Sequence, residues 1–93
     1  MKIVKSDKYL VQLKVIVRFI ALDSPFRARK FKQELESKVK SLDNFPYKYR
    51  KSIHFKSEQI RDMIFLGYVI PYFVDKSNNQ IVVIGIVKYQ DGV

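Results

Sequence analysis

The sequence predicts an α+β fold of order β-α-α-β-β-β, in which a helical hairpin packs on a small, mainly antiparallel sheet. Two observations lead to this prediction. Apolar residues recur every three or four positions in the first half of the chain, whereas the second half contains short apolar runs separated by turn-forming residues. A chain of 93 residues, 47% of them apolar, is expected to form a single domain, residues 1–93, around one core.

A short strand over residues 1–5 is followed by two predicted helices. Ser6 or Asp7 can cap the first helix, which ends just before Ser24. Ser24 can cap the second helix, and Pro25 then falls in the first turn, where its missing N–H is not needed. The expected core residues are Leu10, Leu13, Ile16, Val17 and Ile20 on the first helix and Ala28, Phe31, Leu35, Val39 and Leu42 on the second.

Strands are expected after Pro46, where the helical periodicity stops. The expected strand segments are residues 53–55, 60–66, 68–74 and 81–87, with turns at Gly67 and residues 76–79. Pro71 cannot donate to a ladder, so the middle strand should lie at an edge or meet a bulge. The last strand is apolar on both faces apart from Gly85, which predicts a central strand covered on both sides.

The chain is strongly basic. It has 18 Lys and Arg against 9 Asp and Glu, a formal charge of +9, which favours nucleic acid, an acidic protein or an anionic membrane surface as partner. It has no cysteine, which excludes disulfides and thiolate chemistry. Its most apolar stretch, residues 9–22, is interrupted by Gln12, Lys14 and Arg18, so we expect no secretory signal, no membrane span, no membrane partner and a cytoplasmic location.

Residues 47–56 combine four basic side chains, one histidine and three aromatic rings. Basic groups neutralise phosphates and aromatic faces stack on unpaired bases, so this segment is a candidate nucleic-acid or target-binding site. A solvated basic loop whose aromatic rings cap the core explains the same composition, and the sequence leaves both interpretations open. The candidate binding residues here are Lys48, Tyr49, Arg50, Lys51 and Lys56.

The sequence contains no motif of a familiar catalytic or metal site. His54 is the only histidine, so there is no HxH or HExxH pair, and we expect neither a zinc site nor any other metal or cofactor. The three glycines do not form a phosphate-binding loop. Any catalysis would have to use arginine, lysine and tyrosine on a bound phosphodiester.

Three stretches resemble the RelE/ParE superfamily of bacterial toxins. They are residues 19–25 with Ala28 and Phe31 between the helices, residues 42–46 at the helix exit, and the strand pair 60–65 and 67–72 with the last strand 84–87. The resemblance covers nearly the whole chain and implies the toxin of a type II toxin–antitoxin system. It also implies a cognate antitoxin as partner in a hetero-oligomer, and the charge of +9 suggests that this antitoxin is acidic.

The family divides by target, and the residue after Gly67-Tyr68 bears on the choice. RelE-like members cleave mRNA on the ribosome and carry an arginine there, whereas ParE-like members inhibit DNA gyrase. Val69 stands at that position and cannot stabilise phosphate charge, so the resemblance favours DNA gyrase as the target. We also expect the additional C-terminal helix of the RelE-like branch to be absent.

Two alternatives to gyrase inhibition remain: a RelE-like nuclease acting on the ribosome and mRNA, and a non-toxic nucleic-acid-binding module. At the end of the last strand, Lys88-Tyr89-Gln90 preserves a cation and a phenol, as the nuclease branch requires. Arg61 and Lys88 join the candidate binding residues. The candidate catalytic residues of a nuclease are Arg50, Lys51, His54, Arg61, Lys88 and Tyr89.

Overall fold

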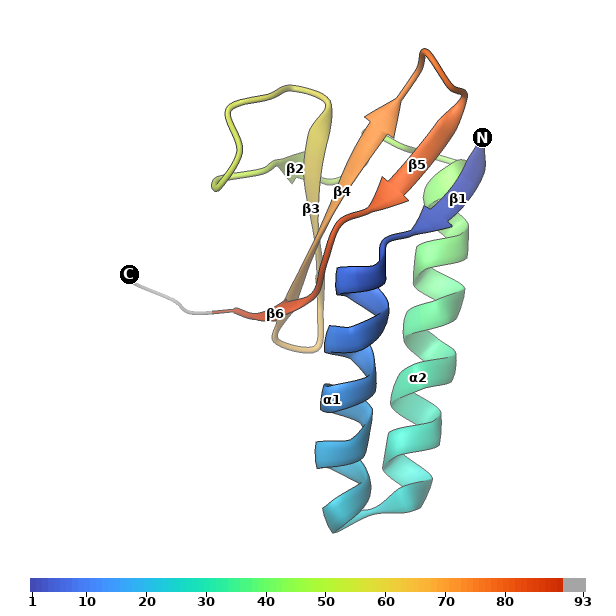
Figure 1. The fold of residues 1–93 in the computed structure, drawn as a ribbon, viewed down its shortest axis with the longest axis vertical. Coiled ribbons are helices and arrows are strands. Elements are labelled where there is room, and N and C mark those ends of the chain that lie inside the picture. Colours follow the sequence, from blue (N-terminus) through green and yellow to red (C-terminus); the bar gives the residue numbers. More distant parts are fainter. Residues whose placement is uncertain (90–93) are drawn as a thin grey trace.

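The structure, a computed structural model, describes residues 1–89 and confirms the α+β prediction (Figure 1). Its elements are β1 (Lys2–Lys5), α1 (Asp7–Asp23), α2 (Pro25–Lys40), the 3-10 turn η1 (Ser41–Asp43), β2 (Arg50–Lys51), β3 (Ile60–Phe65), β4 (Tyr68–Asp75), β5 (Gln80–Val83) and β6 (Val87–Lys88). No helix among the described residues is long and apolar enough to cross a membrane.

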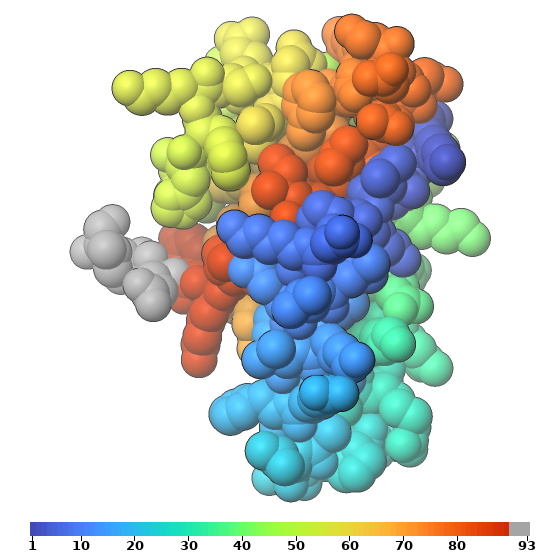
Figure 2. Space-filling model, in the orientation of Figure 1, coloured from blue at the N-terminus to red at the C-terminus, as the bar shows by residue number. Residues whose placement is uncertain are grey.

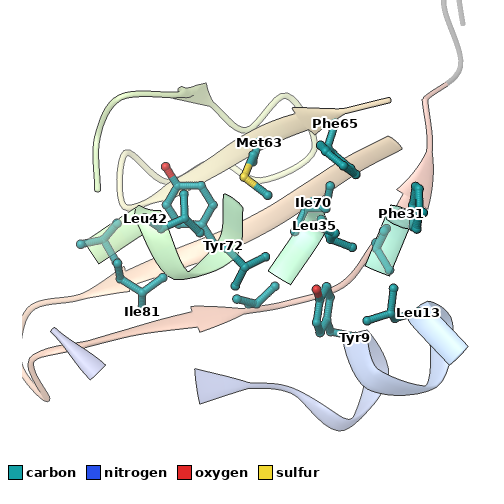
Figure 3. Packing of buried hydrophobic residues seen from close by; sticks show 14 residues of the cluster. Tyr9, Leu13, Phe31, Leu35, Leu42, Met63, Phe65, Ile70, Tyr72 and Ile81 are labelled. Carbon is teal, nitrogen blue, oxygen red and sulfur yellow. The ribbon is translucent and has the colours of Figure 1, made fainter. Parts of the chain in front are cut away.

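One mixed sheet lies against the helical hairpin. Its strand order is β1-β5-β4-β3-β2, with β6 paired to β4 outside this path. The pair of β1 and β5 is parallel, and the other pairs are antiparallel. Side chains such as Met63, Ile70 and Tyr72 point from the sheet into a core that is closed by Leu13 and Leu35 of the helices (Figure 3). We call the sheet face opposite this core the open face.

Both helix starts are as predicted. The Ser6 hydroxyl accepts a hydrogen bond from the Tyr9 N–H at 3.0 Å, and the Ser24 hydroxyl accepts one from the Arg27 N–H at 3.1 Å. Each serine thereby satisfies a donor that has no partner inside its own helix. The predicted stripe of the second helix is confirmed in full, since Ala28, Phe31, Leu35, Val39 and Leu42 are all buried.

The core face of α1 differs from the prediction. Tyr9, which the periodicity did not select, is fully buried, whereas Leu10 remains 46% exposed. The helix contacts the core along Tyr9, Leu13, Ile16 and Ile20, a spacing of four, three and four residues, and this line turns Leu10 toward the edge. Burial, helped by the negative charge of Glu36, raises the pKa of Tyr9 to about 12.

The predicted strand over residues 53–55 is wrong. These residues form bends, and the strand beside β3 is instead β2, three residues earlier. Side chains take the backbone donors that a strand would use: the Ile53 N–H donates to Asp62 Oδ2 at 3.3 Å, and the His54 N–H donates to the Ser52 hydroxyl at 3.3 Å. Such local bonds offer the backbone an alternative to a ladder.

The last predicted strand, residues 81–87, is interrupted in the structure. β5 lies between β1 and β4, as expected of a central strand, but residues 84–86 are irregular and β6 follows them. Along β5, Ile81 and Val83 are fully buried while Gln80 and Val82 are partly exposed. The helices therefore cover one face of this strand, and the expectation that both faces are covered is wrong.

Pro71 lies opposite this interruption. β4 has neighbours on both sides, so the edge alternative is wrong. The partner of β4 changes from β5 to β6 across residues 70 and 71, and the pairing shifts by one residue: Tyr72 pairs with Val83, whereas Val69 pairs with Val87. One extra residue on the strand opposite is a bulge, which confirms the other alternative. The missing N–H of Pro71 falls there, on the side where its C=O accepts from the Ile84 N–H at 2.9 Å.

Candidate functional site

The aromatic part of the basic segment is built into the fold. Tyr49 packs against the core, and its ring meets that of Tyr72 edge-on at 6.5 Å. The Tyr47 hydroxyl donates to Gln59 Oε1 at 2.6 Å, and the Arg61 guanidinium lies 4.9 Å from the centre of the Tyr47 ring. These contacts support the interpretation of Tyr49 as a ring that caps the core, whereas the exposed Tyr47 ring is held at the surface by Gln59 and Arg61.

Arg61 binds this segment to β3. Its Nε donates to the Glu58 carbonyl at 3.1 Å and one terminal nitrogen donates to the Tyr49 carbonyl at 3.2 Å. A second tie comes from the buried Tyr72, whose hydroxyl donates to the Pro46 carbonyl at 2.6 Å and whose pKa is raised by burial to about 12. Arg61 therefore uses two of its donors to hold the backbone at residues 49 and 58, while Tyr72 holds residue 46.

Asp62 anchors the next part of the segment, and the sequence did not single it out. Its carboxylate is fully buried. Oδ2 accepts from the Ile53 N–H and lies 3.9 Å from the Arg50 guanidinium, while Oδ1 has no hydrogen-bond partner among residues 1–89. The sequence could have revealed this anchor, because Asp62 is a carboxylate within an otherwise largely apolar strand. A buried carboxylate needs hydrogen-bond partners, and those partners hold a neighbouring segment in place.

The strand register determines which side chains share a face of the sheet. Paired residues of an antiparallel ladder lie on the same face, and the face alternates along each strand. Arg61 pairs with Tyr72, which faces the core, so its side chain lies on the core side. Val69 pairs with both Ile64 and Val87 on the open face. Arg61 and Val69 therefore lie on opposite faces of the sheet.

Ile64, Val69 and Val87 form a lateral row on the open face, which we call the open-face row. Val69, at the centre of the row, is only 4% exposed, whereas Ile64 and Val87, at the two ends of the row, are each 43% exposed. The row is therefore an apolar strip across β3, β4 and β6 with Val69 at its centre.

The candidate residues divide between two ends of the β3–β4 ladder. Arg50 and Lys51 pair with Asp62 and Arg61 at one end, while Lys88 pairs with Tyr68 at the other. Figure 2 shows the loop that contains His54 and Lys56 (yellow-green) at the upper left, with β6 (red) below it. Tyr89 follows β6 with its side chain partly exposed, and Gln90 lies outside the described residues.

Besides Arg50 and Arg61, two further candidate cations are engaged with partners. Lys51 Nζ lies 3.0 Å from Glu58 Oε1, and this hydrogen bond together with the lysine charge lowers the pKa of Glu58. Lys48 Nζ lies 5.5 Å from the centre of the Tyr49 ring. Residues 1–89 contain no group of three or more His, Cys, Asp or Glu side chains that could hold a metal ion.

A groove of about 480 Å³ runs along the helical hairpin. Its apolar lining is Leu10, Leu13 and Val17, and its charged lining is Lys5, Lys14, Arg18, Lys32 and Glu36. Four cations against one carboxylate make this a basic groove with an apolar floor. The exposed side of α1 continues the apolar surface through Val11, Val15, Phe19 and Leu22. The sequence analysis missed this second stripe because it considered only one apolar face of the helix.

Comparison with known proteins identifies the family. None of the curated proteins matches this sequence. Among solved structures, the one titled "Chromosomal ParDE TA system from P. aeruginosa" is similar, with a TM-score of 0.76, 18% sequence identity and 97% of each chain covered. At this identity the likeness concerns the fold. The sequence profile of the family described as "ParE toxin of type II toxin-antitoxin system, parDE" matches residues 3–91. Because that match spans almost the entire chain, the chain belongs to the ParE toxin family of type II toxin–antitoxin systems.

Proposed function

We propose that this toxin arrests growth by inhibiting DNA gyrase and that an acidic antitoxin neutralises it. The observation that carries the choice of target is Val69. It is nearly buried within the open-face row, where the nuclease branch requires a cation at the scissile phosphate. Loss of one such electrostatic group typically reduces kcat by about 100- to 1000-fold, so an apolar row argues against phosphodiester cleavage.

No side chain of the neighbouring strand β3 supplies the positive charge that Val69 lacks. Arg61, one of the candidate catalytic residues, lies on the opposite face of the sheet and is bound to two backbone carbonyls. The remaining candidate catalytic residues are divided between the two ends of the β3–β4 ladder. A nuclease needs its cations gathered around one phosphate, so this separation also favours a protein target over an RNA substrate.

Two assays on the purified protein test the target. The first measures DNA supercoiling by gyrase with increasing toxin, and the second measures mRNA cleavage on programmed ribosomes by toeprinting. We expect supercoiling to be inhibited and the mRNA to remain intact. Unimpaired supercoiling together with codon-specific cleavage at the A site would support the ribosomal nuclease instead. Expression without growth arrest would favour the non-toxic nucleic-acid-binding module.

Lys88→Ala and Lys40→Ala form a matched pair for the gyrase assay. Both lysines are exposed, but Lys88 belongs to β6 beside the open-face row, whereas Lys40 ends α2. We expect Lys88→Ala to weaken inhibition and Lys40→Ala to leave it unchanged. Equal inhibition by both variants would exclude the β6 end of the sheet as the target contact.

The basic groove along the hairpin supports an acidic amphipathic segment of the antitoxin as its occupant. Lys5, Lys14, Arg18 and Lys32 can pair with carboxylates while apolar side chains enter between the helices. The test is co-purification with any small acidic protein whose gene adjoins that of the toxin. Arg18→Glu should weaken the complex and Lys40→Glu should not. Absence of a complex at micromolar concentrations would contradict the antitoxin assignment.

A further inference from the structure

The N-cap serine of α1 and one side chain within the helix hold the bulge between β5 and β6. The Ser6 hydroxyl donates to the Ile84 carbonyl at 2.7 Å while it also caps α1, and Gln12 Oε1 accepts from the Ile86 N–H at 2.9 Å. These pairs are 78 and 74 residues apart in the sequence, so they join the first turns of the helix to the end of the sheet.

Gly85 provides the space for the second of these bonds. A Cβ atom at this position would lie 2.8 Å from Gln12 Oε1, which is closer than non-bonded atoms approach. The obstacle is the end of a flexible side chain, so an alanine would displace the Gln12 amide from the Ile86 N–H without forcing the backbone to move. Gly85 is therefore needed for this close approach.

Hydrophobicity alone does not choose the register of the strand beyond the bulge. In the structure Ile86 is buried in the core and Val87 lies on the open face opposite Val69. Continuing the β5 pairing without the extra residue would place Ile86 opposite Val69 and Val87 opposite Tyr68. Both residues are aliphatic and similar in size, so exchanging their faces changes the buried apolar area little, and the register is weakly specified by burial.

The register does decide where the polar residues of this end of the chain lie. A shift of one residue moves every side chain to the other face. In the observed register Lys88 pairs with Tyr68, and Tyr89, whose N–H donates to the Gly67 carbonyl at 2.7 Å, shares the open face with Val87. Without the bulge, Lys88 would point to the open face and Tyr89 toward the core.

We propose that Gln12, with Ser6 and Gly85, is a register clamp: it selects the bulged register and so determines that Tyr89, rather than Lys88, presents its side chain to the target on the open face. Gln12 acts here as a positioning residue: its side-chain amide binds the backbone just before β6, and the proposed contact with the target is made by residues of β6 and Tyr89. The inference rests on the proposed toxin function, although it does not depend on which target is inhibited.

Hydrogen exchange tests the clamp independently of toxicity. Gln12→Ala should speed exchange of the Ile86 and Tyr89 amides by about two- to tenfold, the range expected from loss of one net hydrogen bond. Exchange of the Val74 amide, which donates to the Gln59 carbonyl within the sheet, should not change. Gln33→Ala, an exposed glutamine of α2, is the matched control.

Two further variants separate the clamp from a general loss of packing. Gln12→Glu keeps an acceptor at the same reach and should restore the exchange rates of the parent protein. Gly85→Ala should reproduce Gln12→Ala, and the double variant should be no worse than either single one, because both remove the same bond. Additive effects in the double variant, or unchanged exchange in Gln12→Ala, would overturn the proposal.

The functional arm measures growth arrest at equal protein levels, together with gyrase inhibition. Arrest should weaken in Gln12→Ala and Gly85→Ala and return in Gln12→Glu. Faster exchange at Ile86 with undiminished arrest would overturn the link from register to target. Arrest without gyrase inhibition in the parent protein would contradict the proposed target only. A parent protein without arrest would contradict the proposed function, and the exchange pattern would then decide the clamp alone.

Discussion

Replacing Phe31 by alanine tests the packing of the helical hairpin on the sheet. Phe31 is 7% exposed, and its ring centre lies 5.5 Å from that of Phe65 and 5.6 Å from that of Tyr68. Truncating a buried phenylalanine removes its transfer free energy and leaves a cavity, which together cost about 3–5 kcal/mol. A domain of this size has a total stability of roughly 5–15 kcal/mol, so Phe31→Ala should remove a large share of it.

Thermal and urea denaturation measure this loss. With a shift of about 4–8 °C per kcal/mol for a small domain, Phe31→Ala should lower Tm by at least about 12 °C. Phe19→Ala is the matched control, because Phe19 is 69% exposed on α1 and its truncation should change stability by less than about 0.5 kcal/mol. An unmoved midpoint for Phe31→Ala, or equal shifts in both variants, would refute the packing of α2 on β3 and β4.

Three smaller predictions concern pH, capping and a surface ion pair. Because burial raises the pKa of Tyr9 from 10.0 to about 12, the stability that depends on its neutral form is complete below pH 10 and is lost as the pH rises toward 12. Tyr9→Phe should therefore make alkaline unfolding, followed by circular dichroism, less steep. The pH dependence that remains in this variant is expected to come from Tyr72. Ser24→Ala removes the cap of α2 and should cost about 0.5–2 kcal/mol in urea denaturation; no loss would contradict the capping role. Lys51→Ala breaks an exposed pair with Glu58 and should leave the urea midpoint in place, and a clear shift would show that this pair fixes the loop.

Local chemistry was sufficient to predict the helical hairpin. Ser6, Ser24 and Pro25 act through bonds and dihedral limits within one turn, so their roles follow from residue type and position. The core stripe of the second helix follows from its spacing for the same reason. The sequence position directly after Gly67-Tyr68 was also sufficient to identify Val69 as evidence against a nuclease, because a valine carries no charge whichever way its side chain points.

The sequence by itself determined the fold class, the two helices, the basic charge and the resemblance to the toxin superfamily, because each depends on residue type and local spacing. Only the tertiary structure decided the faces and registers. The core side of Arg61, the buried anchor at Asp62 and the bulge held by Gln12 all arise from contacts between different segments of the chain. Apolar residues such as Ile86 and Val87 satisfy either register equally well, so composition cannot distinguish them, and a single hydrogen bond from α1 can.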